Sequence, residues 1–178
     1  MIDLLIHGGT VVTPEGAGRW DVEIVGESIA GVRAPAASAR KDVRRVIDAT
    51  GKIVVPGGID PHVHTNWPVP GPGGKWLINA PPPGVSKAAL YGGTTTLIDF
   101  AVVKPDALIS EAVAAKLATW EGSYADHTVH VLLHGAAPRR VLEQIPEAIT
   151  AGFSSFKLFT TDVKPARKGL MLRYGDIW

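Results

Sequence analysis

Residues 58–64 are Gly-Ile-Asp-Pro-His-Val-His, and they end an apolar, β-prone run. Successive side chains of an extended strand point to opposite faces, so His62 and His64 share one face. Two imidazoles on one side of a short segment are able to bind the same metal ion. Solvated or hydrogen-bonded histidines at a loop entrance fit this spacing equally well. The pair therefore predicts either a metal site or a structured loop.

Further β-rich runs follow this segment, separated by stretches with helical periodicity. We predict strands near residues 53–64, 94–100, 128–134 and 154–159. Helices are expected within residues 105–122 and 138–151, and Pro146 should kink or divide the second one. This alternation predicts four consecutive βα units.

Two segments do not follow the βα pattern. Residues 66–84 contain six prolines and two tryptophans, so we predict a long loop over the strand ends and neither a helix nor a central strand. Residues 1–55 alternate short apolar runs with turns, which predicts a small β meander whose loosest loop is residues 34–42.

Four βα units are half of a (β/α)₈ barrel, which typically has about 250 residues; a doubly wound sheet is the alternative. A four-stranded parallel sheet with two open edges leaves backbone groups unpaired and apolar surface uncovered. The 178 residues are therefore predicted to form an incomplete unit. Alone, we expect them to be inactive and to aggregate or self-associate.

A lysine interrupts the last β-prone run. Lys157 lies in the middle of Gly-Phe-Ser-Ser-Phe-Lys-Leu-Phe, and burying an unpaired ammonium is costly, which favours the neutral amine. A neutral amine can add carbon dioxide and become a carbamate, an anionic ligand able to bridge two cations. A lysine whose head group extends to the strand end is the plainer interpretation.

Composition excludes several classes of protein. The chain has 18 Lys+Arg against 17 Asp+Glu, so it lacks the basic surface that nucleic-acid binding requires. It has no cysteine, which removes disulfides and thiolate metal sites. It also has no long apolar run and no signal-like start. We expect a cytoplasmic protein with neither a nucleic-acid nor a membrane partner.

Three stretches together resemble the N-terminal part of a known family: DATGKIVVPGGIDPHVHT, YGGTTTLIDFA and GFSSFKLF. In order and spacing they are similar to the cyclic amidohydrolases of the dihydropyrimidinase/hydantoinase group, with allantoinase as a close relative. The resemblance implies a distorted TIM barrel and a small β-sandwich. We accordingly assign residues 1–55 to the sandwich portion and residues 56–178 to the first four βα units of the barrel.

The resemblance also implies a site. His62 and His64 correspond to ligands of the more buried ion in a binuclear centre of two divalent metals, most simply zinc. Lys157 corresponds to the bridging, N-carboxylated lysine. The family's two further histidine ligands and its metal-binding aspartate lie on later strands, outside this sequence.

Two substrate-side positions depart from the hydantoinase pattern. Asp162 stands where hydantoinases usually carry a tyrosine that binds substrate and stabilises an oxyanion, and a carboxylate cannot donate to an oxyanion. Asn66 replaces a usual acidic residue and is more similar to allantoinase. The substrate is therefore predicted only as a small cyclic amide.

The leading functional hypothesis is the N-terminal portion of a hydrolase in which a metal-activated hydroxide cleaves a hydantoin-like or dihydropyrimidine-like amide, or a related C–N bond. The missing C-terminal half of the barrel would come from the same gene or a second chain, and we expect a homo-oligomer. The alternatives are a non-catalytic dihydropyrimidinase-like scaffold and a half-barrel module completed by another polypeptide.

Other residues support smaller predictions. Asp99 ends a strand and could orient a ligand or cap a turn. Trp67 and Trp76 could face substrate or anchor the loop. For the histidines of the third strand we predict supporting roles beside the site; they are His127, His130 and His134.

Overall fold

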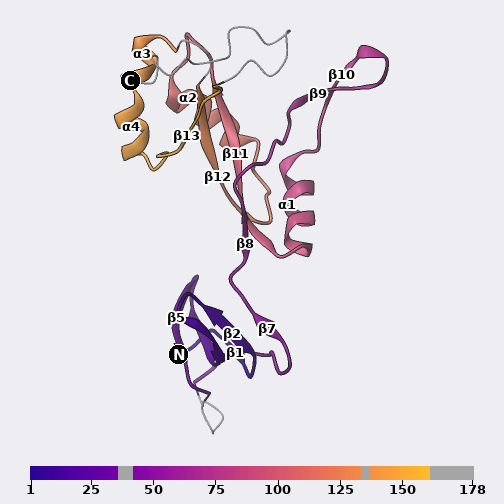
Figure 1. Cartoon of the computed structure of the whole chain (residues 1–178), viewed down its shortest axis with the longest axis vertical. Coiled ribbons are helices and arrows are strands. Elements are labelled where there is room, and N and C mark those ends of the chain that lie inside the picture. Colours follow the sequence, from indigo (N-terminus) through magenta and orange to yellow (C-terminus); the bar gives the residue numbers. More distant parts are fainter. Residues whose placement is uncertain (36–41, 134–136, 161–178) are drawn as a thin grey trace. The chain divides into compact units, whose positions relative to one another are not determined.

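A computed structural model describes residues 1–35, 42–133 and 137–160 (Figure 1). Contacts between residues divide the chain into two compact units, Met1–Pro56 and Gly57–Trp178. Each unit has its own sheets. Within the described residues, no helix has the length and apolar character needed to cross a membrane.

The first unit contains two small sheets. One has the strand order β5-β4-β1-β6 and the other β3-β2-β7. Their strands are β1 (Leu4–His7), β2 (Thr10–Thr13), β3 (Gly16–Arg19), β4 (Asp21–Val25), β5 (Ser28–Arg33), β6 (Val46–Asp48) and β7 (Ile53–Val54).

The predicted meander is wrong in its connections. β1 and β2 follow each other in sequence but lie in different sheets, because β1 pairs with β4 and β6. Gly8, between them, has a φ of 78°, a conformation that glycine adopts without a steric penalty. The chain therefore leaves one sheet and enters the other within two residues. Most of the predicted loop 34–42 lies outside the described residues.

The second unit is built around a parallel sheet. Its order is β13-β12-β11-β8, and all three pairings are parallel. The strands are β8 (Gly58–Asp60), β11 (Thr94–Val103), β12 (Asp126–Leu133) and β13 (Phe156–Lys157). The helices are α1 (Pro82–Tyr91), α2 (Ile109–Ala118), α3 (Arg139–Leu142) and α4 (Ile145–Thr150). Pro146 stands at the start of α4, so the predicted division of the last helical stretch is confirmed.

The single strand predicted over residues 53–64 is wrong. β7 pairs with β2 in the first unit, whereas β8 pairs with β11 in the second. Pro56 separates them, and a proline has no N–H with which to continue a β ladder.

The proline-rich segment 66–84 was predicted to be one long loop, but it contains two short strands and the start of a helix. β9 (Pro68–Pro70) and β10 (Trp76–Ile78) form an antiparallel pair around a short 3₁₀ turn, Pro72–Gly74. α1 begins at Pro82, where proline is favourable because the first N–H groups of a helix have no partner inside the helix.

The two faces of the parallel sheet have different environments. Alternate residues of β11 and β12 pack against α2, α3 and α4 in a buried cluster: Ala101, Val103, Val129, Val131 and Leu133, with Ile109, Val113, Val141 and Ala148 from the helices. The alternate set includes Phe100, which stands opposite His130, and Leu132, which stands opposite Lys157. The site side chains therefore lie on the face away from this helical cluster.

Gly57 lies against the Thr95 side chain of β11, with no room for a side chain of its own. A Cβ added there would lie 2.7 Å from the Cβ of Thr95, an atom that cannot rotate away. We expect Gly57→Ala to lower the free energy of unfolding by about 1–3 kcal/mol. Gly84 in α1 is the control, because a Cβ added there would meet no atom within 4 Å. Gly84→Ala should therefore stabilise the helix by up to about 1 kcal/mol. Thermal unfolding midpoints of the two variants measure the difference; shifts in the same direction would contradict it.

Candidate functional site

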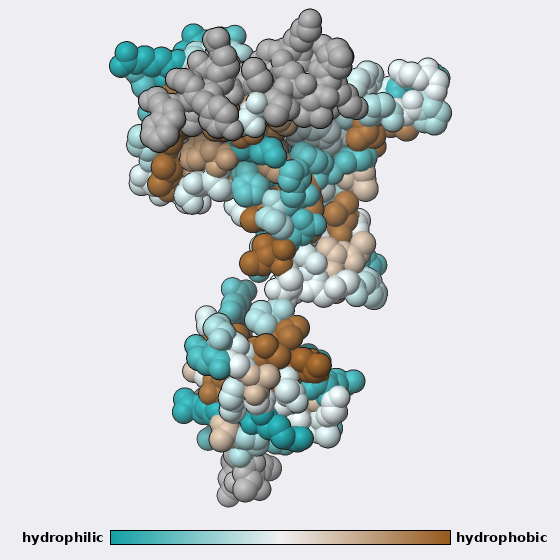
Figure 2. Space-filling model, in the orientation of Figure 1, coloured by the Kyte–Doolittle hydropathy of each residue, from teal (hydrophilic) through white to brown (hydrophobic). Residues whose placement is uncertain are grey.

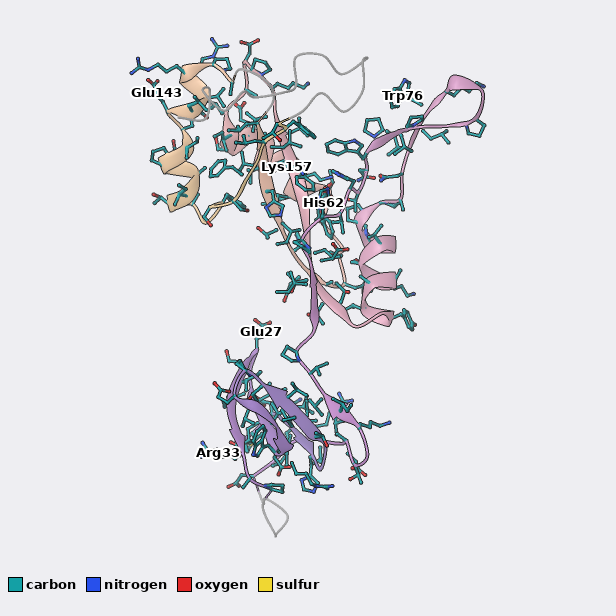
Figure 3. The ribbon with its side chains drawn as sticks, viewed as in Figure 1. Glu27, Arg33, His62, Trp76, Glu143 and Lys157 are labelled. Atoms are coloured by element: carbon teal, nitrogen blue, oxygen red, sulfur yellow. The ribbon has the colours of Figure 1, made fainter. Side chains whose placement is uncertain are left out.

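The ring of Phe100 lies at the centre of the candidate site. The rings of His62 and His64 are each centred 4.8 Å from it, and the ring of His130 is centred 5.2 Å away. The Nζ of Lys157 lies 5.6 Å from the same ring centroid. Two of these four side chains come from the loop after β8, one from β12 and one from β13, and they surround a buried aromatic ring. Figure 3 labels two of them, His62 and Lys157.

His62 and His64 lie next to each other in the loop that follows β8. Their ring centroids are 5.2 Å apart, and the rings meet edge to face. The N–H of His62 donates to Oδ1 of Asp60 at 3.0 Å, which shapes the turn after β8. The segment then returns to the sheet, because the N–H of Val63 donates to the carbonyl of Ile98 at 3.1 Å.

The surroundings of His64 favour the neutral imidazole. Burial lowers the pKa of His64 below its ordinary value, the nearby His62 lowers it further, and Asp99 partly opposes the shift. Lys116 and Lys157 also lower this pKa. A neutral ring is the form that offers a lone pair to a metal ion.

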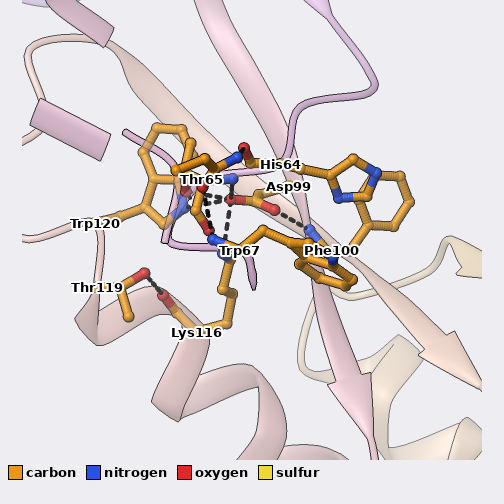
Figure 4. Close-up of polar contacts among 9 residues, drawn as sticks. His64, Thr65, Trp67, Asp99, Phe100, Lys116, Thr119 and Trp120 are labelled. Atoms are coloured by element: carbon orange, nitrogen blue, oxygen red, sulfur yellow. Dashed lines mark hydrogen bonds and ion pairs between the residues drawn. The ribbon is translucent and has the colours of Figure 1, made fainter. Parts of the chain in front are cut away.

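A buried ion pair lies on the face of β11 opposite to Phe100, next to the segment that carries His62 and His64. Lys116 Nζ on α2 is 2.8 Å from Oδ2 of Asp99, whose side chain is fully buried. The same ammonium donates to the carbonyl of Thr65 at 2.6 Å, and the Thr65 hydroxyl donates to Asp99 at 2.5 Å. Trp120 Nε1 also donates to Asp99, at 3.3 Å (Figure 4). The residue after His64 is thus bound to both members of the pair.

Sequence reasoning noticed Asp99 but missed this network. A turn or cap was the predicted alternative for Asp99; instead it accepts hydrogen bonds from several groups inside the protein. The available signal was a carboxylate within the apolar run Leu-Ile-Asp-Phe-Ala, since such a group requires a buried partner. Nothing local identified Lys116 as that partner.

Asn79 fixes the loop that follows His64. Its amide nitrogen donates to the carbonyl of His64 at 2.5 Å, and its amide oxygen accepts the N–H of Trp67 at 2.6 Å. Between these two residues Asn66 takes a φ of +50°, which asparagine tolerates better than most residues. Asn66 and Trp67 line an open cavity of about 460 Å³, together with Phe100, Lys116 and other residues.

The two predicted loop tryptophans have different surroundings. The Trp67 ring is centred 4.7 Å from that of His64. Trp76 on β10 is 68% exposed. Only Trp67 therefore lies beside the candidate site.

The third-strand histidines also differ. His130 Nε2 is 2.9 Å from the carbonyl of Pro61, and Nδ1 is 2.7 Å from Oγ of Ser155. His127 instead stacks on Trp120, with ring centroids 5.0 Å apart.

His134 and Asp162 lie outside the described residues. Within residues 1–35, 42–133 and 137–160, no three His, Cys, Asp or Glu side chains are grouped closely enough to hold a metal ion.

Comparisons with known proteins agree with the geometry. The chain is 35% identical over 159 residues to a D-hydantoinase of Streptomyces coelicolor, which covers 87% of this chain and 33% of that protein. It is 34% identical over 167 residues to the dihydropyrimidinase of Rattus norvegicus, covering 88% and 30%. A solved dihydropyrimidinase from Brevibacillus agri superposes with a TM-score of 0.81 at 30% identity, covering 99% of this chain and 36% of that one. In sequence and fold, the chain corresponds to the N-terminal part of the hydantoinase–dihydropyrimidinase group. No family model matches it.

The correspondence with hydantoinases confirms the predicted fold class. A crystal structure of a D-hydantoinase superposes with a TM-score of 0.81 at 27% identity over 99% of this chain. The sheet β8-β11-β12-β13 is thus the first half of a TIM-type amidohydrolase barrel. The chain spans about a third of the length of the hydantoinases and dihydropyrimidinases it matches.

Proposed function

We propose that this chain supplies the N-terminal portion of a binuclear metal-dependent hydrolase acting on cyclic amides or related C–N bonds. One observation carries the proposal: His62, His64 and Lys157 gather around Phe100 at the carboxyl ends of parallel barrel strands. Catalytic groups of TIM-barrel enzymes lie at this end of the barrel. The similarity to hydantoinases and dihydropyrimidinases supports the same substrate class.

The donor set fits the metal centre that this group of enzymes implies. His62 and His64 would hold one ion through imidazole nitrogens, a preferred ligand type of zinc. Lys157 would hold both ions after carboxylation, in which the neutral amine adds carbon dioxide, forms an N–C bond and releases a proton. Bound divalent cations would supply an activated water and polarise the carbonyl oxygen of the substrate.

The loop after His64 is proposed to form one wall of the substrate site. Asn66 and Trp67 line the open cavity on the side of Phe100, and the Asn79 clamp keeps their backbone in place. An amide and an indole ring offer a hydrogen bond and a flat apolar contact, which suit a small cyclic amide. Asp162 remains a predicted contact outside the described residues.

We propose that further barrel strands, from the same gene or a second chain, complete this portion. Apolar side chains are visible on the surface of both units (Figure 2). Several large hydrophobic residues are more than half exposed, among them Ile29, Ile53, Val55, Ile59, Trp76 and Ile78. The remaining two thirds of a hydantoinase-sized protein could bury such surface. A homo-oligomer in the cytoplasm is part of the same proposal.

Lys157 provides the direct test. In the completed protein we expect an adduct of about 44 Da on this lysine, detected by native mass spectrometry and lost on acidification. Lys157→Ala should lack the adduct and should lose activity, and small carboxylic acids should partly restore that activity by occupying the bridge.

Lys104 offers a matched control, since it is exposed and directly follows β11. Lys104→Ala should keep both adduct and activity. An unmodified Lys157 in a protein loaded with two metal ions would refute the assignment of this residue. If the metal-loaded protein hydrolysed neither hydantoins nor dihydropyrimidines, the proposed substrate class would be refuted.

A further inference from the structure

His130 makes two hydrogen bonds that reach both sides of the candidate site. Its Nε2 is 2.9 Å from the carbonyl of Pro61, the residue before His62. Its Nδ1 is 2.7 Å from Oγ of Ser155, two residues before Lys157. One imidazole on β12 therefore touches the segments that carry all three proposed ligands.

These contacts determine which ring nitrogen carries the proton. A carbonyl oxygen can only accept, so Nε2–H of His130 must donate to Pro61. In the neutral ring Nδ1 is then an acceptor, and the Ser155 hydroxyl donates to it. Both nitrogens are occupied, so His130 is not available as a metal ligand in this arrangement.

The contact with Pro61 crosses a strand. β8 and β12 are not neighbours in the sheet, because β11 lies between them. His130 stands opposite Phe100 of β11, and the two rings are centred 5.2 Å apart. The imidazole thus passes over the middle strand on the barrel-interior side, and its bond to Pro61 links the carboxyl end of β8 to the middle of β12.

The contact with Ser155 holds the last strand. β13 has only two residues, paired with Val131 and Leu132 of β12. The N–H of Val131 adds one bond to the carbonyl of Ser155 at 3.0 Å. With so short a ladder, the His130–Ser155 hydrogen bond is a substantial part of what sets the position of Lys157.

We propose that His130 is a positioning residue that ties the His62/His64 segment to the Lys157 strand and so sets the separation of the metal ligands. This inference rests on the proposed metal centre. It assigns His130 no contact with substrate or metal, and it predicts that the two ligand segments loosen together when the imidazole is removed.

The test uses the completed protein and hydrogen exchange by mass spectrometry on peptides covering residues 61–65 and 153–157. His130→Leu should speed exchange in both peptides, whereas Ser155→Ala should speed it only in the second. His130→Gln retains an N–H near the position of Nε2, so it should protect residues 61–65 better than leucine does. Two matched controls should leave both peptides unchanged: His127→Leu, from the same strand, and Ser154→Ala, beside Ser155.

Zinc affinity then separates positioning from a merely structural role. By competition with a chelator, His130→Leu should bind zinc about 10- to 100-fold more weakly, the range seen when groups supporting metal ligands are removed, and His127→Leu should not. If His130→Leu left hydrogen exchange unchanged in both peptides, the proposal that His130 connects the two ligand segments would be overturned. Faster exchange with unchanged zinc affinity would overturn the positioning role. A wild-type protein that binds no zinc would refute the proposed function, while the exchange pattern would still decide whether His130 joins the segments.

Discussion

His62→Ala and His64→Ala should each remove bound metal and nearly all hydrolysis from the completed protein. Each substitution deletes one imidazole of a two-histidine pair whose ring centroids are 5.2 Å apart, so the remaining ring cannot hold the ion alone. Without the cation, nothing lowers the pKa of the attacking water toward neutrality. Metal content by elemental mass spectrometry and initial rates on a hydantoin measure the two losses.

A third histidine separates this effect from a general loss of stability. His127 stacks on Trp120, away from Phe100, so His127→Ala should keep its metal and its rate. Full metal content in both His62→Ala and His64→Ala would exclude these residues as ligands. Metal loss in all three variants would indicate unfolding and would remove the support that this experiment gives to the site.

Removing one member of the buried ion pair is the change expected to cost most in stability. Asp99→Ala leaves the Lys116 ammonium, the Thr65 hydroxyl and the Trp120 N–H without their shared acceptor. An unpaired buried charge typically costs about 3–5 kcal/mol. Lys116→Met should cost less, because Asp99 retains its other donors. Urea unfolding of the completed protein measures both values.

An exposed ion pair of the same unit is the control for this experiment. Arg139 and Glu143 form an i,i+4 pair at 2.9 Å with side chains 92% and 62% exposed. Such pairs contribute about 0.3–0.5 kcal/mol, so Glu143→Ala should scarcely change the midpoint. If Asp99→Ala proved as mild as Glu143→Ala, the pair would not be what anchors Thr65.

Much of the fold was predictable because its signals are local. Strand and helix periodicities located β11, β12, α2 and the helical stretch that Pro146 divides. The predicted strands were approximate at their ends, and the one over residues 53–64 merged two strands from different units. Periodicity shows that a segment is β-prone but does not show which strand it pairs with.

The candidate site, like the fold, was predictable only where its signals are local in the sequence. By itself, the sequence determined which residue types were available: two histidines of one parity, a lysine in an apolar run, and their register with the hydantoinase group. These features depend on neighbours a few positions away. The family resemblance, carried by three short stretches, then assigned them a common purpose.

Only the tertiary structure decided which side chains support those residues. Lys116 bonds to Thr65 across 51 positions, Asp99 to Thr65 across 34, and His130 to Pro61 across 69. Strand order, the covering helix and the crossing of β11 bring these pairs together. A hydrogen bond depends on distance and direction in space, and no periodicity along the chain encodes either for residues so far apart.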